Sequence, residues 1–299
     1  MSQSPQRPLT STEQGVDRLA HRLLARVPHR GPAAVLAELG VFAIKQAWAV
    51  LFGAAMLAVL LAARLWYPDG APLARNDAIT IAALVIQLLM LALRLETLGE
   101  LRVVLTFHVV GTVMELFKTG IGSWEYPAGG VLRIGAVPLF SGFMYASVGS
   151  YLVRVFRLFE LRFDRYPRIW LTAVLAALVY ANFFSHHWIW DARYVLIVAV
   201  VALYLRCTMH FRVFRVRARM PILLAFALVT VFIWFAENIG TFARAWSYPA
   251  QAAAWHPVAP GKLGSWFLLM IISVVLVTWV HRPRPPEAAD RGLATGRAP

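Results

Sequence analysis

Long apolar segments separated by short polar ones make up most of the chain. A helix needs roughly 20 mostly apolar residues to cross a bilayer. Segments close to that length cover residues 46–66, 78–95, 101–119, 134–156, 169–188, 194–211, 221–241 and 264–280. The pattern predicts an all-α fold, a polytopic membrane helix bundle with eight transmembrane helices.

The polar segment before the first span has its own periodicity. Its apolar residues recur at helical spacing with arginines between them; they are Val16, Leu19, Leu23, Leu24 and Val27. This spacing predicts an amphipathic helix along the membrane surface, ending at Pro28. A disordered tail is the alternative.

Composition agrees with a membrane protein and explains the charge. Hydrophobic residues make up 60% of the chain and charged residues 15%, against about 25% charged in a soluble domain. Eight spans place 22 of the 29 basic residues on the side of the N-terminus and of segments 154–168 and 206–219. Because basic loops stay in the cytoplasm, we predict a multi-pass protein of the cell membrane with both termini cytoplasmic.

The net charge of +14 therefore predicts contact with the lipid bilayer. It does not predict a nucleic-acid partner, since no nucleic-acid-binding motif occurs. The single cysteine, Cys207, excludes an internal disulfide. The oligomeric state is left open.

One motif occurs twice. Glu-x3-Thr-x4-Trp-x-Tyr-Pro begins at Glu115 and returns 122 residues later at Glu237, and the same shift pairs Trp48 with Trp170. We infer a duplication. Since four spans return the chain to its starting side, the two units would be parallel, related by a pseudo-twofold axis along the membrane normal. The predicted divisions are a cytoplasmic tail with the amphipathic helix (1–44), two four-helix repeats (45–160 and 161–281) and a disordered cytoplasmic tail (282–299).

Each repeat carries an acid within an apolar span, where a carboxylate is costly and usually functional. Steps of three and four residues place each acid in a polar stripe on one helical face. The stripes are His108, Thr112, Glu115 and Thr119, and Thr230, Trp234, Glu237 and Thr241. We predict that Glu115 and Glu237 are paired catalytic acids facing one interior, with His108, Thr119 and Thr241 as binding residues. In the alternative, Thr and Glu side chains clasp neighbouring helices.

The aromatic residues that follow each acid have two interpretations as well. Trp124, Tyr126, Trp246 and Tyr248 fit an aromatic belt at the membrane interface. Because their spacing from the acid is the same in both repeats, we predict that they line the same cavity and bind its ligand.

Nothing in the sequence identifies a cofactor. His186, His187 and His256 show no metal-binding spacing, so we predict no metal site, although a site built from Glu115, Glu237 and histidines is an alternative. Nucleotide-binding loops and serine-nucleophile motifs do not occur. The cofactor is therefore unknown.

Three segments carry a family resemblance. HVVGTVME at 108–115, GSWEYP at 122–127 and RIGAVPLFSGFMY at 133–145 resemble the YoaT-like family of bacterial integral membrane proteins of unknown function. The resemblance implies a bacterial inner membrane location and no established activity.

A fainter resemblance is to membrane enzymes of carotenoid end groups, the integral lycopene cyclases and carotenoid hydratases. It rests on Trp-x-Tyr near a Gly-x-Val-Pro turn, residues 124–138. The cyclases follow that proline with an acidic pair, whereas this chain has Phe140 and Ser141, and Lys262 and Leu263 in the second repeat. The departure argues against cyclase chemistry.

Three classes of function follow. The first is acid–base chemistry on a lipophilic, isoprenoid-like small molecule; the second is a proton- or cation-coupled transporter or a binding protein; the third is a structural membrane protein without a ligand. An apolar slot open to lipid would favour the first, a polar path across the bundle the second, and a filled core the third.

Overall fold

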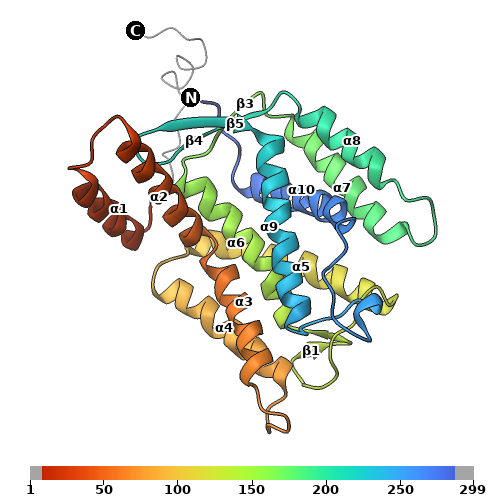
Figure 1. Cartoon of the computed structure of the whole chain (residues 1–299). Helices are drawn as coiled ribbons and strands as arrows, with labels where there is room; N and C mark the ends of the chain where they lie inside the picture. Colours follow the sequence, from red (N-terminus) through yellow and green to blue (C-terminus); the bar gives the residue numbers. More distant parts are fainter. Residues whose placement is uncertain (1–8, 287–299) are drawn as a thin grey trace.

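The computed structural model describes residues 9–286, which form ten α-helices, five short strands and one 3-10 helix (Figure 1). The helices are α1 Ser11–Leu24, α2 Pro32–Ala49, α3 Leu51–Trp66, α4 Arg75–Ala92, α5 Leu98–Gly120, α6 Phe140–Leu158, α7 Ile169–Ser185, α8 Arg193–Tyr204, α9 Ile222–Phe242 and α10 Lys262–Val280. The strands are β1 Arg133–Ile134, β2 Val137–Pro138, β3 Arg162–Asp164, β4 Thr208–Arg212 and β5 Arg217–Pro221, and η1 is Pro249–Gln251.

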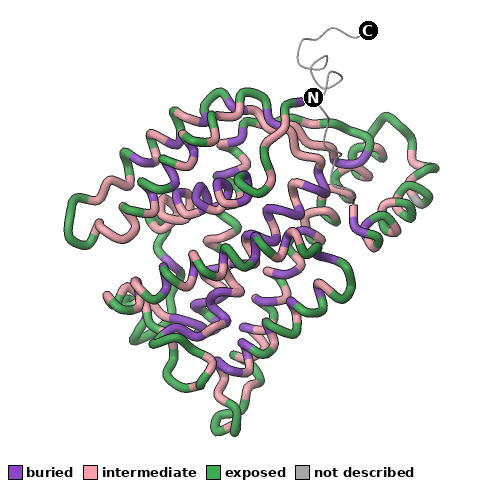
Figure 2. Tube along the Cα trace, turned by 180° about the vertical axis from the view of Figure 1, so that it is seen from behind, coloured by how far each residue is buried: buried purple, intermediate pink, exposed green. Residues whose placement is uncertain are grey.

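The helix bundle has two different ends. The antiparallel sheet β3-β4-β5 lies at one end, at the top of Figure 1, and we call this the sheet end. The antiparallel pair β1-β2 lies at the bottom, and we call this the hairpin end. The apolar core lies between them, where purple segments gather inside the green surface of Figure 2.

Apolar helices indicate a membrane protein. Three helices, α4, α9 and α10, are long and apolar enough to cross a bilayer. The pair α2 and α3, bent by 64°, would make a fourth, and α7 and α8 are shorter apolar helices. Large apolar side chains also face outward, which a soluble surface rarely shows in such number. On α4 and α9 they include Leu84, Leu88, Leu228, Phe232 and Phe235.

The first predicted span differs from the structure at its start. The helix begins at Pro32, which suits a first helical turn because its missing N–H has no partner there anyway. It breaks at Val50, where α3 continues in a new direction. The boundary predicted at residue 44 therefore falls inside α2.

Two other predicted spans contain strands. In 194–211, the helix ends at Tyr204, and β4 pairs in register with β5. Alternation of Met209 and Phe211 with polar neighbours suits a strand better than a helix. In 134–156, the helix starts only at Phe140, because β1 and β2 form a tight turn through Gly135, at φ 57°.

The inner helices α5 and α6 pack closely through glycines. A Cβ at Gly111 would lie 2.5 Å from the ring of Tyr145, and one at Gly149 would lie 2.8 Å from the ring of Phe107. Only glycine permits this approach. It lets the Tyr145 side chain of α6 cross the surface of α5.

The helix predicted near the N-terminus is α1. It begins with a capping box between Thr10 and Glu13 and ends at Leu24, before the predicted stop at Pro28. Val16 and Leu19 are exposed, so an apolar strip of α1 faces outward. The predicted tail from 282 onward lies mostly outside the described residues.

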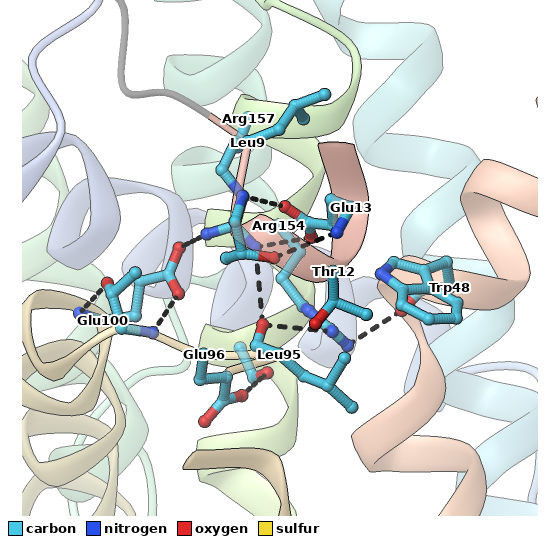
Figure 3. Close-up of polar contacts among 12 residues, drawn as sticks. Leu9, Thr12, Glu13, Trp48, Leu95, Glu96, Glu100, Arg154 and Arg157 are labelled. Atoms are coloured by element: carbon cyan, nitrogen blue, oxygen red, sulfur yellow. Dashed lines mark hydrogen bonds and ion pairs between the residues drawn. The ribbon is translucent and has the colours of Figure 1, made fainter. Parts of the chain in front are cut away.

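Buried charges join α1 to the bundle at the sheet end (Figure 3). Arg157 of α6 donates to Glu13 of α1, at 2.7 Å, and to Glu100 of α5. Arg154 is fully buried and donates to the carbonyl oxygens of Trp48 and Leu95. These contacts fix α1 against α5 and α6.

Glu96 completes this group of charges. It accepts hydrogen bonds from Gln87, at 2.7 Å, and from Ser150. We call Glu13, Glu96, Glu100, Arg154 and Arg157 the sheet-end network. Its arginines, which the sequence pattern assigns to a basic cytoplasmic segment, are buried at this helix junction.

Candidate functional site

A cavity of about 1290 Å³ runs through the bundle between α2, α3, α6, α9 and α10. Towards the sheet end its walls are mostly apolar; they include Phe159, Phe163, Met209, Phe211 and Met220. Towards the hairpin end its lining includes Glu115, Lys118, Arg193, Glu237 and Lys262. The cavity is therefore an apolar shaft with a charged end.

One wall of the cavity reaches the surface. Val50, at the bend between α2 and α3, lines the cavity and is 38% exposed, and Leu228, Phe232 and Phe235 of α9 line it and are more exposed still. In a bilayer these side chains would face acyl chains. A lipophilic molecule could enter the shaft there from the membrane.

Glu115 is held by three neutral donors. Its Oε2 accepts from Trp124 Nε1 and from the Tyr126 hydroxyl, each at 2.8 Å, and its Oε1 accepts from the Tyr145 hydroxyl at 2.8 Å. Glu115 as a whole is 4% exposed. Burial is costly for a charged group unless hydrogen bonds satisfy it, and here both oxygens have partners.

Glu237 has a similar but smaller set of donors. The Tyr248 hydroxyl donates to Oε1 and Trp266 Nε1 donates to Oε2. Tyr248 stands 122 residues after Tyr126, so each acid binds the tyrosine of its own motif. Lys262 is close enough to interact electrostatically with Glu237 but forms no ion pair with it.

The two motifs meet at the hairpin end. Glu125 and Ser247, which are 122 residues apart, exchange backbone hydrogen bonds of 3.0 and 2.9 Å. The rings of Trp124 and Tyr248 lie edge to face, with centroids 6.1 Å apart.

The two acids also act on one tyrosine. Burial and the Glu237 carboxylate, with a smaller contribution from the Glu115 carboxylate, raise the pKa of Tyr248 above its ordinary value. Tyr248 donates to Glu237, and its ring contacts Trp124, which donates to Glu115, so one aromatic pair joins the two acids.

Comparison with known proteins identifies the family. Residues 38–274 match the family described as "Protein of unknown function (DUF817)". The chain belongs to this family. It is also 41% identical over 236 residues to "Uncharacterized protein YoaT" of Bacillus subtilis (strain 168). The aligned region covers 79% of this chain and 89% of that protein. No solved structure matches the chain.

The DUF817 match includes both acids and the aromatic residues of both motifs. Neither description names an activity, so the resemblance to carotenoid enzymes remains a prediction. The match leaves out α1 and with it Glu13.

Six of the nine residues predicted for the site line the cavity. They are Glu115, Trp124, Tyr126, Glu237, Trp246 and Tyr248. The other three do not. His108 packs on Phe143 between α5 and α6, Thr119 donates to the carbonyl of Glu115, and Thr241 accepts from Trp255.

Tyr145 and Trp266 are the donors that sequence reasoning missed. The 122-residue shift pairs Tyr145 with Phe267 and Trp266 with Met144, so the repeat gave no signal for either. A signal for Tyr145 was present in Gly111, which stands one helical turn before Glu115 and leaves room for its ring.

The histidines are divided between two places. His186 and His187 line the cavity, whereas His256 contacts the carbonyls of Ala250 and Pro257 in the last loop. Among residues 9–286, no three His, Cys, Asp or Glu side chains are grouped as metal ligands. The alternative site combining Glu115, Glu237 and histidines is therefore not assembled among them.

Proposed function

We propose that this DUF817 protein binds an elongated lipophilic molecule, isoprenoid-like in shape, in the cavity and carries out acid–base chemistry on it with Glu115 and Glu237. The observation that carries the proposal is the apolar shaft that reaches the outer face of α9 and ends at both acids. A largely apolar pocket with a few convergent polar groups is typical of a small-molecule site.

The proposal includes the membrane arrangement. We infer eight spans, in which α2 and α3 together form the first and α4 to α10 the others, as two parallel four-helix repeats with both termini cytoplasmic. Two observations support the repeats. Adding 122 to the bounds of α6 gives those of α10, and the backbone pairing of Glu125 with Ser247 joins equivalent positions.

The chemistry follows from the groups around each acid. A carboxylic acid in a dry pocket can give its proton to an isoprenoid double bond. A Tyr hydroxyl can donate to a carboxylate or accept from a carboxylic acid, so Tyr126, Tyr145 and Tyr248 can serve either protonation state. Indole N–H groups only donate, so Trp124 and Trp266 favour the ionised form that exists after proton transfer.

The other two classes of function have less support. A cation-coupled transporter needs a polar path through the bundle, whereas the cavity walls towards the sheet end are largely apolar. A structural protein without a ligand would have a filled core. The clasp interpretation of the glutamates stays compatible with the contacts, and the Glu→Gln variants discussed below separate it from acid chemistry.

A matched pair of variants on α9 tests the binding proposal. Ala225 lines the cavity, whereas Ala227 is exposed and does not. Mass spectrometry of lipid extracts from the purified protein should identify a lipophilic molecule, retained by Ala227→Phe and lost from Ala225→Phe, whose ring would fill the shaft. Equal retention by both variants, or no bound lipophile in the wild-type protein, would contradict the proposal.

A further inference from the structure

We propose that the hairpin end of the cavity is a binding site for a phosphate-type head group, so that the ligand is an amphiphile whose apolar part lies in the shaft. This inference rests on the proposed function for its apolar part. Its polar part rests on three cations, Lys118, Lys262 and Arg193, which all line the cavity.

Lys118 is the central observation. It is 3% exposed, although it lies in the last turn of α5. Its Nζ donates to Nε2 of His187 at 2.7 Å and lies 4.2 Å from the centre of the Phe183 ring. No carboxylate of the described residues forms an ion pair with it. A buried ammonium group with only neutral contacts is costly unless an anion joins it.

Two further cations from other elements lie nearby. Lys262, at the start of α10, lies 4.1 Å from the centre of the Tyr248 ring. The charges of Lys262 and Arg193 both act on Lys118, and the Asp191 carboxylate offsets part of their effect. Three like charges at one cavity end repel one another, and a shared anion would remove that repulsion.

The acids nearby leave this charge incompletely balanced. Asp191 is bound to Arg193 at 3.1 Å and to Asn182 at 3.1 Å. Glu237 acts on Lys262 but is occupied by Tyr248 and Trp266. Glu115 is likewise occupied by three neutral donors. Neither lysine is therefore ion-paired with a carboxylate of the described residues, and protonation of either glutamate would leave the cations in excess.

A phosphate group fits this arrangement. It carries about −1.5 to −2 charge near neutral pH and offers three acceptor oxygens, and lysine binds phosphate as a point charge. The donors come from three elements, so they can reach different oxygens. The start of α10 at Lys262 adds the positive end of a helix dipole.

Lysine is also rare here. The chain has only Lys45, Lys118 and Lys262, and its other basic residues are all arginine. Two of the three lysines line this cavity end, where they add charge without the width of a guanidinium group.

The test compares three probes in phosphatidylcholine nanodiscs: dodecyl phosphate, dodecanol and inorganic phosphate. Apparent dissociation constants come from the concentration dependence of the thermal unfolding midpoint, since a ligand of the folded state raises it. Wild-type protein should bind dodecyl phosphate about tenfold more tightly than dodecanol. Lys118→Met and Lys262→Met should each lose most of that preference while binding dodecanol as before.

Two matched variants complete the test. Arg64→Met, which removes an exposed cation at the same end outside the cavity, should keep the preference. Lys118→Arg, which retains the charge, should restore part of it even if Lys118→Met folds poorly.

The outcomes separate the two proposals. Equal binding of dodecyl phosphate and dodecanol, or lysine variants with an unchanged preference, would overturn the head-group site and leave the proposed function standing. Inorganic phosphate that binds as tightly as dodecyl phosphate would overturn the amphiphile and make free phosphate the ligand. Failure of both dodecyl compounds to bind would overturn the head-group site and the lipophile site together.

Discussion

The two ends of the bundle bury charge in opposite ways. At the sheet end, Arg157 is shared by Glu13 and Glu100, so these three buried charges form ion pairs. At the hairpin end, Glu115 has only neutral donors, and Lys118 forms no ion pair among the described residues. The charged residues of the sheet-end network do not line the cavity, whereas Glu115 and Lys118 do.

This difference separates structural charge from functional charge. A buried ion pair orients the helices that carry it, and because each charge is already balanced by a side chain, no ligand is needed to balance it. Buried groups without a counter-charge are usually found where a ligand or a proton completes the balance.

Removing the shared arginine should have the largest effect. Arg157→Met keeps much of the side-chain volume but leaves Glu13 and Glu100 buried without their cation, which should cost about 3–5 kcal/mol of unfolding free energy. Arg168→Met, an exposed control at the same end, should change it by about 0.5 kcal/mol or less. Thermal unfolding in nanodiscs measures both, and similar stability of the two variants would mean that the network is not structural.

Removing one acid of the pair should cost less. Glu13→Ala leaves Arg157 bound to Glu100, so the loss should be about 1–3 kcal/mol and confined to the attachment of α1. Hydrogen exchange should then rise across Ser11–Leu24 while α5 and α6 stay protected. If α1 exchanges as slowly as in the wild-type protein, its docking depends on its apolar side chains instead.

At the hairpin end, neutral replacements should affect stability little and chemistry strongly. Glu115→Gln and Glu237→Gln keep shape and one acceptor oxygen, so each should cost about 1 kcal/mol, more at Glu115 because it has three donors to satisfy. Neither amide can exchange a proton as an acid. Both variants should therefore still bind the lipophile but stop converting it.

Mass spectrometry of the bound molecules checks this, with Thr241→Val as a control outside the cavity. A large loss of stability in the Gln variants with unaltered bound molecules would favour the interhelical clasp over the paired acids.

The sequence predicted the features that depend on periodicity. Apolar spacing placed α5, α9 and α10 within three residues of their observed ends, and the repeated motif located both acids and four aromatic residues of the cavity. Features that depend on a single contact were missed. Tyr145 and Trp266 have no repeat equivalents, and Met209 and Phe211 were counted as helical because hydropathy ignores strand pairing.

Charge was misread for a related physical reason. Counting basic residues to orient a chain treats every arginine as facing water. Arg154 and Arg157 are buried instead, because the groups that accept their hydrogen bonds come from distant parts of the chain. Sequence alone cannot bring such partners together.

Single cysteine substitutions at exposed positions, which should disturb the structure least, test which end of the bundle faces the cytoplasm. Cys207 is 2% exposed, so the wild-type protein should react little with an impermeant maleimide. Labelling of a single introduced cysteine can therefore be compared with this low background. Asp69→Cys and Pro257→Cys, both exposed at the hairpin end, should react in intact cells. Arg168→Cys at the sheet end should react only after permeabilisation, because the basic loops there are predicted to be cytoplasmic. The reverse labelling would invert the bundle, place the phosphate-type site at the cytoplasmic face and change which pool of amphiphiles could reach it.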